Sequence, residues 1–448
     1  MKKVNKLTVY AVALAVFFSA CKEDDVVESD PTTGTTEIPE TFSSFTPEQN
    51  KANLEDNGIE LIQEMDALKD APGVEATASF AYWMDQAPAT AANGRILRTA
   101  HTIQKYQKGD ASAKDIFASM RMAADEPASI QEFYNQYMGV YSWNATHQEW
   151  DYSKEGGKIV FKFPGTENGS SNNAELLIHS YEGVNTPNPI DEDYSGDLPT
   201  KLVTEVKVDG AQVMVYNFNA AYNQQGEPTS VKTSLSLNTF TFAFEAKNDS
   251  ENVGSAYSLT KGNKILISMG AGAKGTFTTE QIEKVDNSDS YNEGDIVTEA
   301  NAFFQVMDVK MAGSVNVATL VDGMQGLYED EVPYMEEEEY KAYEKEQADK
   351  EAVLYNENIN LIVFYASKKE KIADTEFYTY EDTYEYFTYE YDYETENYYP
   401  VTKEGSYTTV GMKFIFADDS KSDMEAYFGE GFDELTTELT KFTESLQE

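Results

Sequence analysis

The sequence is poor in the residues that most often build metal sites and nucleophilic sites. It has one cysteine, Cys21, and three histidines, His101, His147 and His179. A single thiol excludes an intrachain disulfide, and a chain of this length can bury a large core without one. The histidines lack the HExxH spacing of zinc proteases, and no GxSxG nucleophile motif is present. We therefore expect no catalytic residue, although acids are so abundant that a paired-carboxylate hydrolase is not ruled out.

Basic side chains are also scarce. The chain has 34 lysines and arginines against 79 aspartates and glutamates, a net charge of −45 at pH 7. Such a surface repels nucleic acid and anionic lipid headgroups, so neither is expected as a partner. It favours solubility, and it also suits cations or a basic partner protein. We expect a monomer with no nucleic-acid function.

Residues 1–20 have the pattern of a signal peptide. Three lysines precede an apolar run from Leu7 to Phe18, and two small residues, Ser19 and Ala20, precede Cys21. The run is shorter than the roughly 20 residues that span a bilayer, so we predict that it is removed. The segment resembles a bacterial lipoprotein signal, in which the cysteine is lipidated and becomes the mature N-terminus. The resemblance implies a lipid anchor on Cys21.

A short acidic stretch follows the cysteine, made of Lys22, Glu23, Asp24 and Asp25. It resembles the tag that Bacteroidota lipoproteins use to reach the outer face of the outer membrane. The resemblance implies an outer-membrane protein that faces the cell exterior. A periplasm-facing anchor is one alternative, and a linker kept extended by its own charge is another.

The chain changes character twice after the anchor. Residues 21–45 are acidic and threonine-rich without periodicity, and we expect a flexible tether. Thr46-Pro47-Glu48-Gln49 has the pattern of a helix N-terminus with a capping box. Helical spacing then continues, so residues 46–138 are predicted to be the helical part of the body. The expected helices begin at Thr46 and continue over 75–87, 94–107, 112–124 and 128–138.

From residue 139 the hydrophobic period changes to two, which is typical of strands. Asp209-Gly210 separates the expected strands 201–208 and 211–220 and predicts a tight hairpin. Leu237 and Phe240 have opposite parity, which predicts a bulge near Asn238 in a single strand. Other strands are expected at 141–143, 149–152, 158–163, 174–181, 256–260, 264–269, 301–317, 358–366 and 412–416.

Two helical segments complete the body, an acidic helix over 334–350 and a C-terminal helix over 420–446. The elements predict an α+β fold with a large curved antiparallel sheet, a meander that forms an open half-barrel. The N-terminal helices and the C-terminal helix are expected to pack on this sheet. We expect 139–448 to be the sheet region and 46–448 to be one domain.

Residues 376–399 contain nine tyrosines with acids between them. Two sets have opposite parity: Tyr378, Tyr380, Tyr384 and Tyr386, then Tyr389, Tyr391 and Tyr393. This pattern predicts a long strand or hairpin with a register slip near Phe387. Stacked rings beside carboxylates are a candidate glycan-binding surface. In the simpler interpretation the tyrosines cover the core of the sheet and the acids face water.

Two further patterns are candidate ligand sites. Oxygen ligands alternate along Asp191, Asp193, Ser195 and Asp197, which resembles the first half of an EF-hand calcium loop. Leu202 stands where that loop needs a glutamate, so an acidic turn is the alternative. Ca²⁺ is the only cofactor that the sequence suggests.

The run from Gly270 to Gly275 fits the GxGxxG motif of nucleotide-binding loops. That motif should open a helix, but the neighbouring segments are predicted hairpins. We therefore interpret these glycines as positions where backbones approach closely in a sheet.

The sequence thus predicts a lipid-anchored envelope protein whose body binds a ligand without catalysis. The ligand is expected to be a glycan, or an apolar molecule in a groove between sheet and helices. A structural or adhesive surface protein that binds cations or a partner protein is the alternative. An extracellular hydrolase with a carboxylate site is the third hypothesis.

Overall fold

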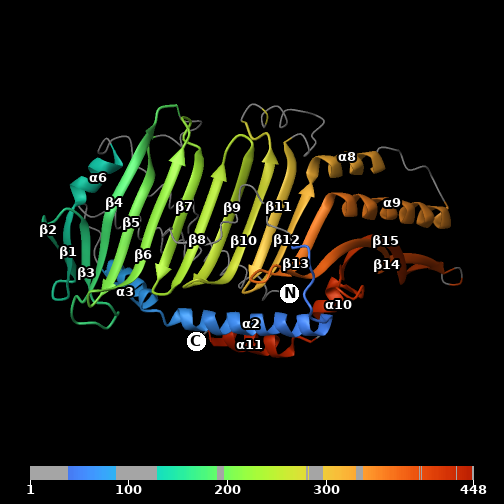
Figure 1. The fold of residues 1–448 in the computed structure, drawn as a ribbon, viewed down its shortest axis with the longest axis horizontal. Helices are drawn as coiled ribbons and strands as arrows, with labels where there is room; N and C mark the ends of the chain where they lie inside the picture. Colours follow the sequence, from blue (N-terminus) through green and yellow to red (C-terminus); the bar gives the residue numbers. More distant parts are fainter. Residues whose placement is uncertain are drawn as a thin grey trace. The chain divides into compact units, whose positions relative to one another are not determined.

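The computed structural model describes residues 39–86, 129–188, 196–278, 281, 296–328, 336–392, 394, 396–429 and 431–445. In this part of the chain, sixteen strands form one open, mostly antiparallel sheet, and seven helices accompany it (Figure 1). The predicted α+β class is confirmed at this level. Among the described residues, no helix is both long and apolar enough to cross a membrane.

The elements have the following bounds. The helices are α2 (Pro47–Lys69), α3 (Pro72–Gln86), α6 (Ile130–Tyr137), α8 (Val317–Tyr328), α9 (Glu337–Asn358), α10 (Met424–Gly429) and α11 (Asp433–Ser445). The first strands are β1 (Gly139–Asn144), β2 (Glu149–Ser153), β3 (Ile159–Phe163), β4 (Ala174–Thr186), β5 (Gly196–Val208), β6 (Ala211–Tyr222), β7 (Pro228–Leu237) and β8 (Phe240–Asn248). The others are β9 (Asn252–Lys261), β10 (Lys264–Gly275), β11 (Val297–Val306), β12 (Val309–Asn316), β13 (Ile359–Tyr365), β14 (Glu370–Asp392), β15 (Asn397–Ile415) and β16 (Lys421–Asp423).

Strand order follows chain order from β3 to β16. The exception is at the start of the sheet, where β1 lies between β2 and β3. After the β1–β2 hairpin the chain crosses to the other side of β1, so β3 runs parallel to β1 with Gly139 opposite Ile159. We expected antiparallel pairs throughout, and this parallel pair departs from that expectation.

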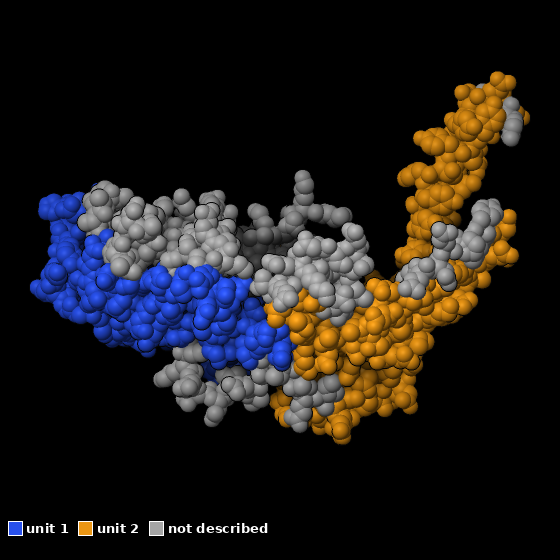
Figure 2. Space-filling model, turned by 90° about the horizontal axis from the view of Figure 1, so that it is seen from above, with its two compact units in different colours: residues 1–33, 60–272, 304–307 blue, residues 34–59, 273–303, 308–448 orange. Residues whose placement is uncertain are grey.

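The chain divides into two compact units. Unit 1 comprises residues 1–33, 60–272 and 304–307, and unit 2 comprises 34–59, 273–303 and 308–448 (Figure 2). Each unit therefore combines strands with helical residues, and the helix α2 contributes to both.

In unit 1, helices cover one face of the strands. α3 contacts β5, β6 and β7, and its Gly73 lies so close to β6 that an added Cβ would be 2.4 Å from the Val213 carbonyl oxygen. The C-terminal half of α2 is tied to this unit by ion pairs of Glu64 with Lys261 and Lys264. The core at the β1–β3 end is aromatic, with Phe163 fully buried and its ring 5.1 Å from that of Phe80.

In unit 2, the core lies between β13, β14, β15 and the N-terminal half of α2. The buried Tyr365 hydroxyl donates a hydrogen bond to Asn50 Oδ1 of α2 at 2.9 Å, and the Phe414 and Tyr427 rings pack edge to face. The C-terminal helix α11 contacts α2: its Glu434 N–H donates to Glu55 Oε1 at 3.0 Å. No residue of α11 is buried, so this helix contributes little to the core.

Several local predictions are confirmed. Gln49 N–H donates to Thr46 Oγ1 at 3.3 Å, while Thr46 N–H donates to Gln49 Oε1 at 3.0 Å, the reciprocal bonds of a capping box. The hairpin across Asp209-Gly210 joins β5 to β6. The expected helices 94–107 and 112–124, like the tether up to residue 38, lie outside the described residues.

Two expectations about register are wrong. Asn238 does not lie in a bulge: it is a turn residue with φ 55° between two strands, in which Leu237 pairs with Phe240. The parity change arises because the chain reverses there. The predicted slip at Phe387 is also absent, because β14 and β15 stay in one register from Asp374 opposite Ile415 to Asp392 opposite Asn397.

Candidate functional site

The last long hairpin of the sheet extends as a two-stranded ribbon. β13 pairs with β14 only as far as Asp374, and β16 pairs with β15 only from Lys413 onward. Among the described residues, the two strands therefore have only each other as strand partners between Thr375 and Met412. Unit 2 carries narrow projections in the space-filling view (orange in Figure 2). We call the two-stranded part of β14 and β15, between Thr375 and Met412, the ribbon. It contains the tyrosine-rich sequence.

The unbroken register assigns the aromatic residues to two faces of the ribbon. One face, called the tyrosine face, contains Tyr378, Tyr380, Tyr384, Tyr386, Tyr399 and Tyr407. The opposite face contains Phe377, Phe387, Tyr389, Tyr391 and Tyr398. The two parity sets thus lie on different faces because no slip brings them together, and Tyr393 is outside the described residues.

Two glycines of β15 set the positions of the rings on the tyrosine face. Gly405 stands opposite Tyr384, and a Cβ there would be 2.7 Å from the Tyr384 Cζ. Gly411 stands opposite Tyr378, and a Cβ there would be 2.8 Å from the ring of Tyr380. The rings therefore lie across the partner strand where it has no side chain, an arrangement in which aromatics cover strand glycines.

The rings form two pairs along β14. The centroids of Tyr378 and Tyr380 are 5.8 Å apart, as are those of Tyr384 and Tyr386, with the Tyr407 ring 5.9 Å from Tyr384. Offset contacts of this kind are typical of favourable aromatic pairs. The tyrosine face thus presents two neighbouring rings over three residues of β14 at each pair.

Carboxylates lie among these rings and hold them. Tyr407 donates its hydroxyl hydrogen to Asp382 at 3.0 Å, and this bond raises the pKa of Tyr407. Tyr399 donates to Glu390 at 3.3 Å. A 2.8 Å ion pair with Lys403 holds the pKa of Glu390 below its usual value.

The tyrosine face is open to solvent. The exposed fractions are 48% for Tyr384 and 41% for both Tyr380 and Tyr386. The interpretation in which these tyrosines cover the core is therefore wrong. α9 contacts the other side, where the Tyr355 ring is 5.2 Å from Phe377.

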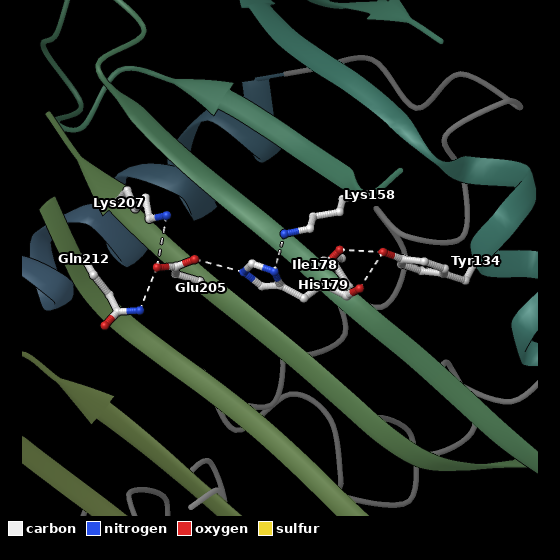
Figure 3. A network of polar contacts seen from close by, with 7 residues as sticks. All are labelled: Tyr134, Lys158, Ile178, His179, Glu205, Lys207 and Gln212. Atoms are coloured by element: carbon white, nitrogen blue, oxygen red, sulfur yellow. Dashed lines mark hydrogen bonds and ion pairs between the residues drawn. The ribbon is translucent and has the colours of Figure 1, made fainter. Parts of the chain in front are cut away.

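A second polar arrangement lies in unit 1 around His179 (Figure 3). His179 occupies a register shift in β4, with Nε2 2.9 Å from Glu205 Oε2 and Nδ1 2.8 Å from Lys158 Nζ. Because an ammonium group only donates, Nδ1 accepts and Nε2–H donates to the carboxylate. Tyr134 of α6 donates to the carbonyls of Ile178 and His179, at 2.8 and 3.0 Å, and so holds the irregular backbone. Both ring nitrogens are occupied, which favours a structural role.

Glu205 is the buried centre of this network. Burial alone would raise its pKa, but hydrogen bonds from His179, Gln212 and Lys207 outweigh burial, so the pKa is lowered. A lowered carboxyl pKa stabilises the fold above the unfolded value near 4.5, and this stability is lost as the pH falls through the folded pKa.

We predict that Glu205→Gln lowers the free energy of unfolding at pH 7 by about 1–3 kcal/mol, because a charged acceptor of several hydrogen bonds is lost. The difference from the unsubstituted chain should shrink in acid, at a pH below the lowered pKa of Glu205, where Glu205 itself becomes protonated. Urea unfolding at both pH values measures it. Glu182→Gln, which removes an exposed 3.3 Å pair with Lys201, is the matched control and should change little. An equal loss at both pH values would contradict the electrostatic account.

The other predicted site residues are only partly described. Asp197 is buried and accepts a 2.5 Å hydrogen bond from the Ile130 N–H at the start of α6, so its carboxylate has a structural partner. Asp191, Asp193 and Ser195 lie outside the described residues, as do Cys21 and residues 22–25. The described residues bring together no group of three or more potential metal ligands.

The prediction of close backbone approach in the glycine run of β10 is confirmed at Gly275. An added Cβ at Gly275 would be 1.8 Å from the Ile296 carbonyl oxygen, and Thr276 N–H bonds the same oxygen at 2.9 Å. A strand occupies Gly270 to Gly275, where a nucleotide-binding motif would begin a helix.

The described residues also contain an open groove of about 550 Å³ between α8 and α9. Gly323, Leu327 and Val353 contribute to its lining, together with Glu346, Asp349 and Lys350. This groove lies between two helices, whereas we expected an apolar groove between the sheet and its helices. The resolved pKa shifts of the described carboxyl groups are all downward, so none of them marks a general acid.

Sequence reasoning missed part of the tyrosine face. Tyr407, Gly405 and Gly411 belong to β15, which was predicted only from Met412 onward. Their signal is their spacing: Gly405, Tyr407 and Gly411 are separated by even numbers of positions, which places them on one face of a strand. Comparison of the chain with protein-family models, curated proteins and solved structures finds no match.

Proposed function

We propose that the chain is a non-enzymatic binding protein of the cell envelope that holds a glycan on the tyrosine face of the ribbon. One observation supports this proposal above all: tyrosine rings are seated over Gly405 and Gly411 and yet remain exposed. Exposed neighbouring aromatics are costly to maintain in water, and such patches mark interaction sites. Their fixed positions reduce the entropy that binding must overcome.

The chemistry of this face suits a neutral sugar chain. The apolar faces of pyranose rings can stack on tyrosine rings, and sugar hydroxyls can donate to carboxylates such as Asp382 and Glu390. The pairs Tyr378–Tyr380 and Tyr384–Tyr386 offer two contact places along one direction. A polyanionic glycan is disfavoured, because the chain carries a net charge of −45.

The anchor completes the proposal. Lipid on Cys21 would hold the protein in the outer membrane, and the short acidic stretch from Lys22 to Asp25 would direct it to the cell exterior. The part of the predicted 21–45 tether that precedes Thr41 would keep the body away from the bilayer. Residues 41–43 pair with Lys371 of β14, so the end of the predicted tether belongs to the body. In this arrangement the protein captures a glycan at the cell surface and leaves its chemistry to other proteins.

We expect the double substitution Tyr384→Ala and Tyr386→Ala to weaken binding of a neutral glycan at least about tenfold, because two neighbouring stacking rings and their hydroxyls are lost together. Affinity electrophoresis through gels that contain neutral glucans, mannan or xylan provides the measurement. Tyr389→Ala, on the opposite face of the same strand, is the matched control and should retain binding. The proposal fails if no gel retards the unsubstituted chain, or if both variants lose retardation equally.

A further inference from the structure

The outer edge of β14 is the strongest unassigned feature, and side-chain contacts show which backbone groups point to it. Asn356 of α9 donates from Nδ2 to the Phe377 carbonyl and accepts from the Phe377 N–H, both at 2.8 Å. Thr383 N–H donates to Asp382 Oδ1 at 2.8 Å. The backbone groups in these contacts belong to Phe377 and Thr383, which are both odd-numbered. The odd positions of β14 therefore direct their N–H and C=O groups away from β15.

In the described part of the chain, the outer edge is open beyond Thr379, whose hydroxyl donates to Asp349 of α9 at 2.7 Å. Because the β14–β15 register has no shift, Glu381, Glu385, Phe387 and Tyr389 also direct their backbone groups outward. β13 pairs no further than Asp374, so no described strand covers this edge. A two-stranded ribbon is at best marginally stable, and a third strand is the usual way to stabilise it.

The two edges of the ribbon differ. The outward positions of β15 are the even residues that pair with odd residues of β14, and they include Pro400 opposite Tyr389. Proline has no N–H to donate and blocks the addition of a strand at an edge. From Thr379 to Tyr391, β14 has no proline. Only the β14 edge thus keeps an uninterrupted row of donors and acceptors.

The charge beside this edge indicates the kind of partner. Glu385 stands directly opposite Glu404, an unfavourable like-charge pair, and Glu381 lies on the same face of β14, with Thr383 between the two. Between residues 376 and 412 the only basic residue is Lys403, which is paired with Glu390. A second copy of the ribbon would bring acids against acids, whereas a basic strand would relieve the repulsion.

We propose that the outer edge of β14, from Glu381 to Tyr389, takes up an extended basic segment of a partner polypeptide as an added strand. Backbone hydrogen bonds would supply affinity, and side chains at alternate positions would supply selectivity. Lysine or arginine of the partner would pair with Glu381 and Glu385 and lie over the exposed ring of Phe387. The chain already holds a lysine in this way, with Lys413 Nζ 4.4 Å from the Tyr378 ring centre. This site is independent of the tyrosine face.

Proline substitutions can distinguish binding by strand addition at the β14 edge from binding by charge attraction alone. Glu385→Pro removes an outward N–H of β14, and Glu404→Pro removes one of β15; the two residues are cross-strand partners, so both variants lose the same charge at the same level. Neither change removes a hydrogen bond of the β14–β15 ladder, because both N–H groups point outward. The probe is a labelled peptide of about nine residues that alternates lysine and valine, long enough to cover the open edge. Fluorescence anisotropy with the full chain at 150 mM salt measures its affinity.

We expect Glu385→Pro to weaken binding at least about tenfold and Glu404→Pro to change it by less than about threefold. A peptide with N-methyl groups on one edge, tested on the unsubstituted chain, should bind as weakly as the lysine–valine peptide binds to Glu385→Pro. Equal losses in the two proline variants would show charge attraction alone and overturn the proposal. Absence of binding to the unsubstituted chain, or a dimer formed through this edge, would overturn it as well.

Discussion

Replacing Cys21 by serine is expected to release essentially all of the protein from the membrane fraction. Each buried methylene of an acyl chain contributes about 0.8 kcal/mol to membrane attachment, and stable anchoring needs more than one chain. Removing the thiol removes every chain at once. The acidic body offers no compensation, because it is repelled by anionic headgroups. Membrane fractionation followed by detergent phase separation measures the release.

The matched control changes the adjacent acids and keeps the thiol. A variant with Asp24→Asn and Asp25→Asn should remain in the membrane fraction, and labelling of intact cells should show whether it still faces outward. Retention of the Cys21→Ser variant after a high-salt wash would contradict the lipid anchor. Labelling that does not change in the Asn variant would contradict the targeting role of the acids and leave the anchor intact.

Phe163→Ala is expected to lower the free energy of unfolding by about 3–5 kcal/mol, because it leaves a cavity in a rigid core. Phe163 is fully buried in unit 1, and the Phe80 ring contacts both Phe163 and Phe161. Packing of this kind relaxes only partly after a truncation. The loss should lower the urea concentration at the midpoint of unfolding and leave the dependence of the unfolding free energy on urea concentration unchanged.

Tryptophan emission is a suitable readout for this change. The chain has three tryptophans, Trp83, Trp143 and Trp150, and their rings form one cluster with centroid distances of 5.2 and 5.5 Å. The fluorescence signal therefore reports on the same end of unit 1 as Phe163. Phe387→Ala is the control, since that side chain is 81% exposed and its loss should change stability by less than about 0.5 kcal/mol. Equal effects of the two truncations would contradict the assignment of the core.

Local sequence signals predicted much of the fold. The capping box at Thr46 and the turn at Asp209-Gly210 depend on residues within a few positions of one another, so the sequence shows them directly. The long meander follows from strands joined by such turns. The parallel pairing of β1 with β3 depends on which side of β1 the returning chain takes, and no local pattern records that choice.

Parity changes were the main source of error. A change of parity has the same appearance whether the strand bulges, as expected at Asn238, or the chain reverses, as it does there. At Phe387 the parity change needs neither explanation, because both faces of a ribbon without a sheet on either side tolerate aromatic residues. Alternation of aromatic and polar side chains identifies the core-facing side of a strand only when one of its two faces is buried.

The candidate site was predictable in part for the same reason. Tyr378 to Tyr386 share a face, as their spacing indicates. Their exposure depends on where β13 and β16 end, which is a property of the neighbouring strands and is not recorded in the tyrosine run itself. The helix α8 was missed because Gly323 and Gly326 interrupt its apolar pattern, and an added Cβ at Gly323 would clash with Leu354 of α9.

The order of the strands has a consequence for how the chain folds. From β4 to β15, each strand pairs with the strand made just before it and the one made just after it. Most of these pairs close over a short turn, so the entropy cost of those steps is small. The pair β12–β13 is an exception, because α8 and α9 lie between the two strands in the chain. Folding can then proceed strand by strand while the remainder of the chain is still being synthesised or secreted. Deleting one whole hairpin, such as β7 with β8, would leave β6 and β9 as neighbours that run antiparallel, as adjacent strands of the meander do.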